Sequence, residues 1–479
     1  MLFALALAPL SSAQSGTRAE SDEEPDTSLI LPAQGVGKLD LDKLYNAKPS
    51  APKAKTCYVR AEGGALVAKV MAELDDDQRL VMIPTGELEV VAMSDTRPTD
   101  KPFRSATRKQ VIAHLKNGEF EDFTFAESGY YIFGYQGSGA FYLHTKSILE
   151  SLLPGVIAQL REWGLQPQRP ATPMVVIIMP NRAAFDALEP MPQGVAAYYN
   201  VLKNYVVLYE DTRLWEAAPE YAFRQAAYTV AHEGIHQILA NTGIQQRLGK
   251  WPSWISEGLP EYFCPLNVSS RLIKTGGDEL PERTLRWTRA GMVNDLRMRH
   301  LLRSSTRDGG LVRDAVTARQ LTAYGYAVSW GLVHYLGSRE PAKFAEYLRE
   351  IGQSQPLRPI VPRDHRGADP IFVKHFGDDY PILEAKVTRH LLSKPIQKEY
   401  RDPIENQTIY LITSTLKRGR TFWVVPPQPT FSPDAARKFK NRLHERARAE
   451  GREAHVRLIV CDDMDEARYH IRKINAKLQ

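Results

Sequence analysis

Apolar and polar positions change their spacing along the chain, and the change divides it into parts. Between residues 56 and 100, short apolar runs are broken by turn residues, as in RLVMIPTGELEVVAM. Runs of that length with tight turns are typical of β-strands. We therefore predict a small β module over 56–100.

Residues 105–394 combine strand-like and helix-like patterns. GYYIFGY and MVVIIMP are typical of strands, and AAYYNVLKNYVVLY is typical of a hairpin. The apolar spacing of KSILESLLPGVIAQLREWG predicts a helix ending at Gly164, and RAAFDAL predicts another. Beyond the hairpin the pattern is mainly helical to about Ser393. The predicted fold class is α+β, with a small mixed sheet followed by a mainly helical half.

Residues 395–479 predict a small ββαβα module. Its strands are TIYLITS, TFWVVPP and HVRLIVC, and its last helix is DEARYHIRKINAKL. The first helix is basic and can meet an anionic polymer, although acidic residues between the basic ones favour an ordinary solvated face. Its basic residues are Arg437, Lys438, Lys440, Arg442, Arg446 and Arg448.

The first residues resemble a targeting segment. Residues 1–13 are apolar and end in small side chains, with Ser11 and Ala13 placed as at a signal-peptidase site. We expect an exported protein in the periplasm, cell envelope or medium. Residues 14–55 are polar with an acidic cluster, which predicts a flexible linker. No later run approaches the ~20 apolar residues that a transmembrane helix needs.

Composition further limits the classes of protein to which the chain can belong. The 479 residues are 43% hydrophobic and 25% charged, which excludes a fully disordered chain and a polytopic membrane protein. A net charge of +6 gives no reason to expect a nucleic-acid partner. Three cysteines are too few and too scattered for a disulfide scaffold or a cysteine-based zinc module.

The segment TVAHEGIHQIL, residues 229–239, carries the most specific chemistry. Pro219 suits the first turn of a helix and Gly243 suits its C-terminal cap. On that helix His232 and His236 lie one turn apart and project from one face, as two ligands of a zinc tetrahedron do. Glu233 is placed to take a proton from a water on the zinc without being a ligand.

A surface helix with two ordinary histidines is the alternative interpretation. Uncharged residues on both sides of the motif argue against it, because a solvated helix usually carries charges there. Gly234 does not favour the helix, since glycine costs about 1 kcal/mol relative to alanine.

Zinc needs a third protein ligand that leaves one position open. The segment WPSWISEGLPEYF, residues 251–263, offers Glu257 on a second helix. Glu261, one turn later, can accept a hydrogen bond from the remote nitrogen of a ligating histidine.

These two motifs together resemble the gluzincin zinc metallopeptidases, which include thermolysin-like and aminopeptidase-like enzymes. The resemblance covers roughly residues 125–355 and implies a zinc-peptidase domain over 105–394. It implies His232, His236 and Glu257 as zinc ligands and Glu233 as general base. Glu261 matches the carboxylate that thermolysin-like enzymes place four residues after their ligand glutamate. The whole looks closest to an uncharacterised family of exported bacterial peptidase-like proteins.

A third segment, YAVSWGLVHYL, resembles the aminopeptidase-like helix that opens with an oxyanion-stabilising tyrosine. The resemblance implies that role for Tyr326, because Tyr335 and Leu336 follow at the matching positions. Tyr324 is the reserve, and packing is the alternative role for either tyrosine. No Gly-x-Met-Glu-Asn sequence precedes the helix, so recognition of a substrate amino terminus is unsupported.

The expected function is zinc-dependent hydrolysis of a peptide or protein substrate. The rival expectation is a catalytically silent binding or scaffold protein of the cell envelope. Substrate specificity, endo- or exo-cleavage and oligomeric state have no signature in the sequence.

Overall fold

The computed structural model describes the following residues: 2–6, 49–61, 64–75, 77–192, 194–211, 219–265, 267–275, 278–286, 290–294, 297–298, 301, 310–354, 356–357, 369–394, 409–416, 419–425, 440–442, 444–445, 448–449, 455–461 and 469–473. They form two compact units. The first comprises residues 1–292 and 313–378, and the second 293–312 and 379–479. Helices and sheets are both extensive, so the predicted α+β class is confirmed.

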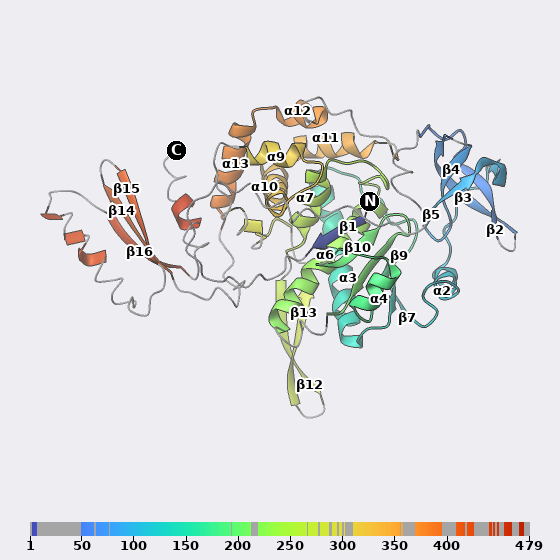
Figure 1. The fold of residues 1–479 in the computed structure, drawn as a ribbon, viewed down its shortest axis with the longest axis horizontal. Coiled ribbons are helices and arrows are strands. Elements are labelled where there is room, and N and C mark those ends of the chain that lie inside the picture. Colours follow the sequence, from blue (N-terminus) through green and yellow to red (C-terminus); the bar gives the residue numbers. More distant parts are fainter. Residues whose placement is uncertain are drawn as a thin grey trace. The chain divides into compact units, whose positions relative to one another are not determined.

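A six-stranded mixed sheet forms the centre of the first unit, in the order β1-β10-β11-β9-β8-β7 (Figure 1). Strands β8, β9 and β11 are parallel, whereas β7, β10 and β1 pair antiparallel with their neighbours. The strands are β1 Leu2–Ala6, β7 Thr124–Ser128, β8 Tyr131–Tyr135, β9 Met174–Met179, β10 Val195–Asn200 and β11 Tyr205–Tyr209. The predicted hairpin is β10–β11.

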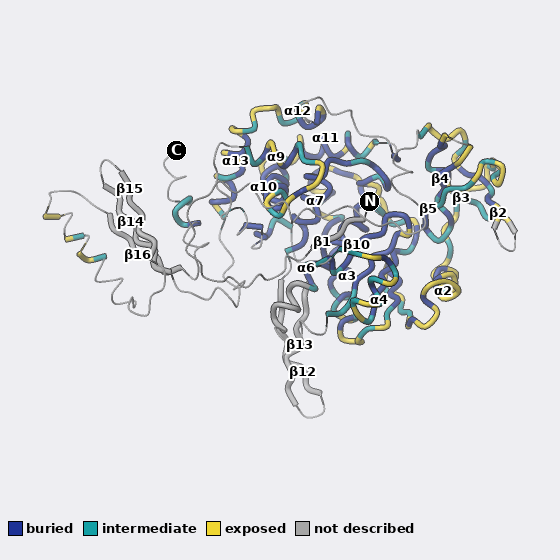
Figure 2. The backbone as a smooth tube through the Cα atoms, in the orientation of Figure 1, coloured by how far each residue is buried: buried dark blue, intermediate teal, exposed yellow. Residues whose placement is uncertain are grey.

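Helices cover both faces of this sheet. Every residue of β9 is buried, as its continuous apolar run requires for a strand covered on both sides (Figure 2). Val175 and Ile177 join one core cluster with Phe185 of α4 and Val111 of α2. Helices α3 and α6 pack on each other and on the sheet. The bounds are α2 Arg108–Lys116, α3 Gly139–Glu162, α4 Arg182–Leu188 and α6 Pro219–Asn241.

The β module predicted over 56–100 is a five-stranded antiparallel sheet in the order β5-β4-β3-β2-β6. Cys57 is buried in the core of this sheet. The strands are β2 Thr56–Ala61, β3 Gly64–Leu74, β4 Gln78–Met82, β5 Leu88–Ala92 and β6 Thr96–Thr99.

A buried arginine fixes this β module to the central sheet. Arg247, 6% exposed, donates to the carbonyl oxygens of Gly86, Val201 and Leu202 at 2.5–3.0 Å. The Leu88 amide also donates to Leu202 O at 2.8 Å. Because the module's β4–β5 turn and the β10–β11 turn share one guanidinium, the module is part of the first unit.

Glu87 strengthens the same junction. Its carboxylate is 1% exposed and accepts from His114 Nε2 at 2.9 Å, Lys203 Nζ at 2.8 Å and Tyr205 Oη at 2.6 Å. Burial alone raises the pKa of Glu87, but these partners outweigh it and lower the pKa to about 2. The folded chain therefore stabilises the ionised carboxylate.

We expect Glu87→Gln to lower the free energy of unfolding by about 3 kcal/mol at neutral pH, from the difference between pKa 4.5 and about 2. Because the folded pKa is depressed, this stabilisation is present above pH 4.5 and is lost as pH falls toward 2. Urea unfolding of both proteins between pH 3 and pH 7 measures the difference. A difference that stays constant over that range would contradict the assignment.

The helical half follows the central sheet. Its described helices are α7 Ser253–Phe263, α9 Leu311–Thr317, α10 Ala323–Arg339, α11 Pro341–Gly352 and α12 Pro370–Phe376. The prediction was a mainly helical half, and the structure adds to it an antiparallel hairpin after α7, β12 Asn267–Thr275 with β13 Asp278–Arg286, which the sequence did not indicate. Neither strand has the regular apolar alternation by which strands are recognised, and β13 is rich in charged residues.

The second unit contains α13, Tyr380–Leu392, and a three-stranded antiparallel sheet. The strands are β14 Ile409–Leu416, β15 Gly419–Val425 and β16 His455–Cys461. Contacts group α13 with these strands, whereas the sequence placed it before the boundary at 394. Lys440, Arg442 and Arg448 of the predicted basic helix are helical, while Arg437, Lys438 and Arg446 lie outside the described residues.

The predicted linker lies mostly outside the described residues, which omit 7–48. Residues 2–6 of the signal-like segment form β1, paired antiparallel with β10. Among the described residues, no helix is long and apolar enough to cross a membrane.

Candidate metal centre

Helix α6 places the two motif histidines on one face. It begins at Pro219, as predicted, and ends at Asn241, beyond which Gly243 adopts φ +74°. His232 and His236 are both fully buried, with ring centroids 4.9 Å apart. The i,i+4 spacing thus places both imidazoles side by side on one face of α6, as the sequence indicated.

Glycines allow neighbouring helices to approach the motif closely. A Cβ at Gly234 would overlap Leu149 Cδ2 on α3, so a larger residue at this position of the motif would force the buried leucine to move. A Cβ at Gly258 would lie 2.9 Å from Ser329 O of α10. Close packing therefore fixes α6 against α3, and α7 against α10.

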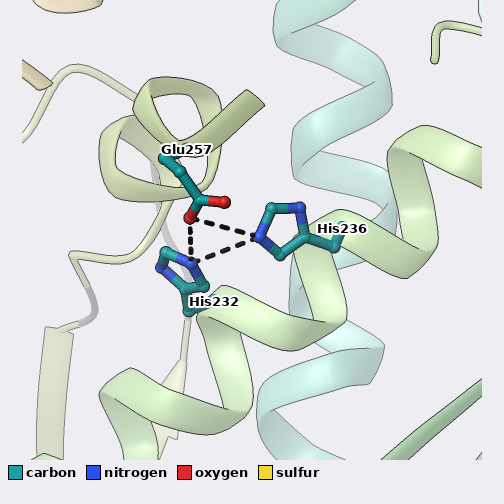
Figure 3. A group of neighbouring side chains, drawn as sticks. All are labelled: His232, His236 and Glu257. Carbon is teal, nitrogen blue, oxygen red and sulfur yellow. Dashed lines mark hydrogen bonds and ion pairs between the residues drawn. The ribbon is translucent and has the colours of Figure 1, made fainter. Parts of the chain in front are cut away.

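Glu257 of α7 completes a buried group of three (Figure 3). His232 Nε2 and His236 Nε2 are 3.2 Å apart, and Glu257 Oε2 lies 3.2 Å from the first and 3.6 Å from the second. A tetrahedral zinc ion with bonds of 2.0–2.2 Å would separate its ligands by about 3.3–3.6 Å. The three donor atoms are therefore spaced as a bound metal ion requires, and the group can hold one.

The protonation states of Glu257 and His236 suit a cation, whereas His232 must release a proton to bind one. Burial alone raises the pKa of Glu257, but His236 and His232 outweigh it and lower the pKa to about 2. Burial lowers the pKa of His236 to about 4, so this imidazole is neutral at neutral pH. Burial acts in the same direction on His232, but hydrogen bonds to Cys264, Glu257 and Glu261 leave its pKa well above the ordinary value.

Glu261 lies behind the first histidine, where the sequence placed it. Its Oε1 is 3.4 Å from His232 Nδ1, and its other oxygen accepts a hydrogen bond from the Tyr228 hydroxyl. Cys264 Sγ also lies 3.8 Å from His232 Nδ1. A carboxylate at Nδ1 favours a proton there, which leaves Nε2 with a lone pair for a metal ion.

Glu233 lies between α6 and the central sheet. It is fully buried, and its Oε2 accepts a hydrogen bond of 2.8 Å from the backbone amide of Tyr199 in β10. This hydrogen bond therefore holds the carboxylate at the strand. The group of ligand atoms that can hold a metal does not include it.

The two tyrosines at the start of α10 have different surroundings. Tyr326 is 8% exposed, and its ring centroid lies 6.4 Å from that of His232. Tyr324 is 46% exposed. The structure thus brings Tyr326 to the side of the candidate metal centre, as preferred from the sequence.

Sequence reasoning missed three contributors to the site. Tyr199 supplies a backbone amide, and the chain offers no local signal for a contact across 34 residues. Cys264 directly follows the second motif and was considered only in the cysteine count. Tyr228 lies one turn before His232 on the same helix face, and that spacing is a signal the sequence did contain.

In the comparison with known proteins, this region matches a family of unknown function. A family model described as a protein of unknown function (DUF1570) matches residues 226–358. The match contains all the predicted site residues, but spans well under half of the chain. No curated protein and no solved structure matches the chain.

Proposed function

We propose that the protein is an exported zinc metallopeptidase that hydrolyses peptide bonds. The observation that carries the proposal is the convergence of His232 Nε2, His236 Nε2 and Glu257 Oε2 at tetrahedral spacing, with a non-ligating carboxylate, Glu233, on the same helix. Structural zinc sites use four protein ligands, whereas catalytic sites use three and keep a position open.

The donor set favours a transition metal, and the non-ligating Glu233 of the H-E-x-x-H motif favours zinc among these. Two imidazoles with one carboxylate suit zinc, whereas calcium and magnesium prefer oxygen donors throughout. Zinc, when bound, would supply Lewis-acid polarisation of a water molecule and of the substrate carbonyl.

The roles of the side chains follow from their positions. Glu233 accepts a proton from the attacking water and passes it to the leaving amine, while Tyr199 N–H keeps its carboxylate oriented. Tyr326 donates a hydrogen bond to the carbonyl oxygen as negative charge develops there. Glu261 keeps the proton of His232 on Nδ1.

A peptide-pool digest tests this function. Full-length protein is incubated with a broad peptide pool, with and without a chelator, and the products are identified by mass spectrometry. We expect cleavage that the chelator abolishes and that added zinc restores. Absence of chelator-sensitive cleavage would favour the rival hypothesis of a silent binding or scaffold protein.

Export rests on the signal-like residues 1–13. We expect protein from the native host to begin near Gln14, and so to lack the edge strand β1, which intact-mass measurement on the envelope or secreted fraction checks. Intact Met1 in that fraction would contradict cleavage.

A further inference from the structure

Three polar side chains form a stripe on α6 at intervals of four residues: Glu233, Gln237 and Asn241. Residues at this spacing share one helix face, and all three bind the sheet or the β10–β11 turn. Glu233 accepts from the Tyr199 amide at 2.8 Å. Gln237 Nε2 donates to Val175 O of β9 at 2.9 Å and to Asn204 O at 2.8 Å.

Asn241 pairs with Asn204 of the β10–β11 turn. Each side-chain amide donates to the carbonyl oxygen of the other, at 3.0 and 2.7 Å. The Tyr199 hydroxyl also donates to Asn204 Oδ1 at 2.8 Å. Burial raises the pKa of Tyr199 to about 12, so the hydroxyl keeps its proton and remains a donor.

Burying polar side chains is costly unless each one keeps a hydrogen-bond partner, as these do. Tyr199, Asn204 and Gln237 are each at most 1% exposed, and a buried polar group that loses its partner costs about 1–3 kcal/mol. Asn204 also adopts φ +63°, a left-handed conformation that few residues other than glycine tolerate. Apolar side chains would hold α6 against the sheet at a lower free-energy cost, but they would not fix the position of the helix along the β10–β11 hairpin.

Tyr199 connects both ends of this network. Its hydroxyl is tied through Asn204 to Asn241 at the end of α6, and its backbone amide holds the Glu233 carboxylate two turns earlier. A shift of the β10–β11 hairpin along α6 would therefore displace the contact to Glu233.

We propose that Tyr199, Asn204 and Asn241 form an amide clasp that positions Glu233 for proton transfer. The three are positioning residues, since they act on Glu233 through the backbone of β10. This inference rests on the proposed hydrolytic function. A displacement of about 1 Å at a reacting group can lower a rate 100-fold, so a loosened clasp lowers kcat.

The test uses full-length Tyr199→Phe, Asn204→Gly and the double variant. Phenylalanine removes only the hydroxyl, and glycine keeps the positive φ while removing the side chain. Thr242→Val is the matched control, because Thr242 directly follows α6 and its Oγ1 donates back to Ile238 O at 2.8 Å. Zinc content, amide exchange at Tyr199, kcat and KM are measured for each protein.

We expect zinc content equal to wild type, exchange of the Tyr199 amide at least about 10-fold faster, and kcat about 10-fold lower with KM changed less. The double variant should be no worse than the more affected single one, because both break the same unit. Exchange and kcat matching those of Thr242→Val would overturn the clasp.

The outcomes separate the clasp from the hydrolytic function. Absence of chelator-sensitive hydrolysis in the wild type refutes the function, and amide exchange then decides the clasp without any kinetics. Faster exchange at Tyr199 in Asn204→Gly supports the clasp, and unchanged exchange refutes it.

Discussion

Zinc-loaded Glu233→Gln is expected to hydrolyse peptide at least about 100-fold more slowly than the wild type, since general acid–base assistance is typically worth 10²–10⁴-fold. Glutamine keeps the size and shape of the side chain, and its amide oxygen can still accept from Tyr199 N–H. It has no carboxylate to take a proton from the attacking water. Because Glu233 is outside the ligand group, zinc content and melting temperature should barely change.

Glu340→Gln provides the matched control. Glu340 lies at the C-terminal end of α10, where its carboxylate accepts a hydrogen bond from the Tyr335 hydroxyl. Its turnover should equal that of the wild type. Kinetics on a peptide cleaved by the wild type, with zinc measured in every sample, give the comparison. Wild-type turnover by zinc-loaded Glu233→Gln would refute the assigned general base.

Tyr326→Phe should lower kcat by about 100-fold or more, in the range measured when one oxyanion donor is removed. The ring remains beside His232, so folding and zinc content should be preserved. Only the hydroxyl, which would donate to the developing oxyanion, is lost. KM should change much less than kcat, because this contact strengthens in the transition state.

Tyr324→Phe is the control for this variant. It removes a hydroxyl from an exposed tyrosine in the same helical turn, so the kinetic constants should not change. Equal kcat in Tyr326→Phe and Tyr324→Phe would assign Tyr326 to packing.

The local parts of the candidate site could be predicted from the sequence. The interval between His232 and His236 defines one helix face, and the motif around Glu257 defines a second helix, so three donor atoms followed from short segments. Gly234, which appeared unfavourable, is explained by the close approach of Leu149 on α3. The apolar periodicity of one helix cannot indicate that contact, because Leu149 lies on another helix.

The features that the sequence did not indicate depend on distant pairings or on patterns without apolar alternation. The amide clasp joins Asn204 to Asn241 across 37 residues, and each asparagine alone is typical of a turn or a helix end. Arg247 joins the β module to the central sheet across 161 residues, so the module could not be recognised as part of the same unit. The β12–β13 hairpin was missed for its polar strands.

Elemental analysis of the purified full-length chain tests the central claim most directly. His236→Gln removes one predicted ligand, and His334→Gln changes a buried histidine of α10 that lies outside the ligand group and contacts Gly291 O at 3.1 Å. We predict about one zinc ion per chain in the wild type and in His334→Gln, and almost none in His236→Gln. Equal zinc content in the wild type and His236→Gln would contradict the metal centre, and with it the proposed peptidase.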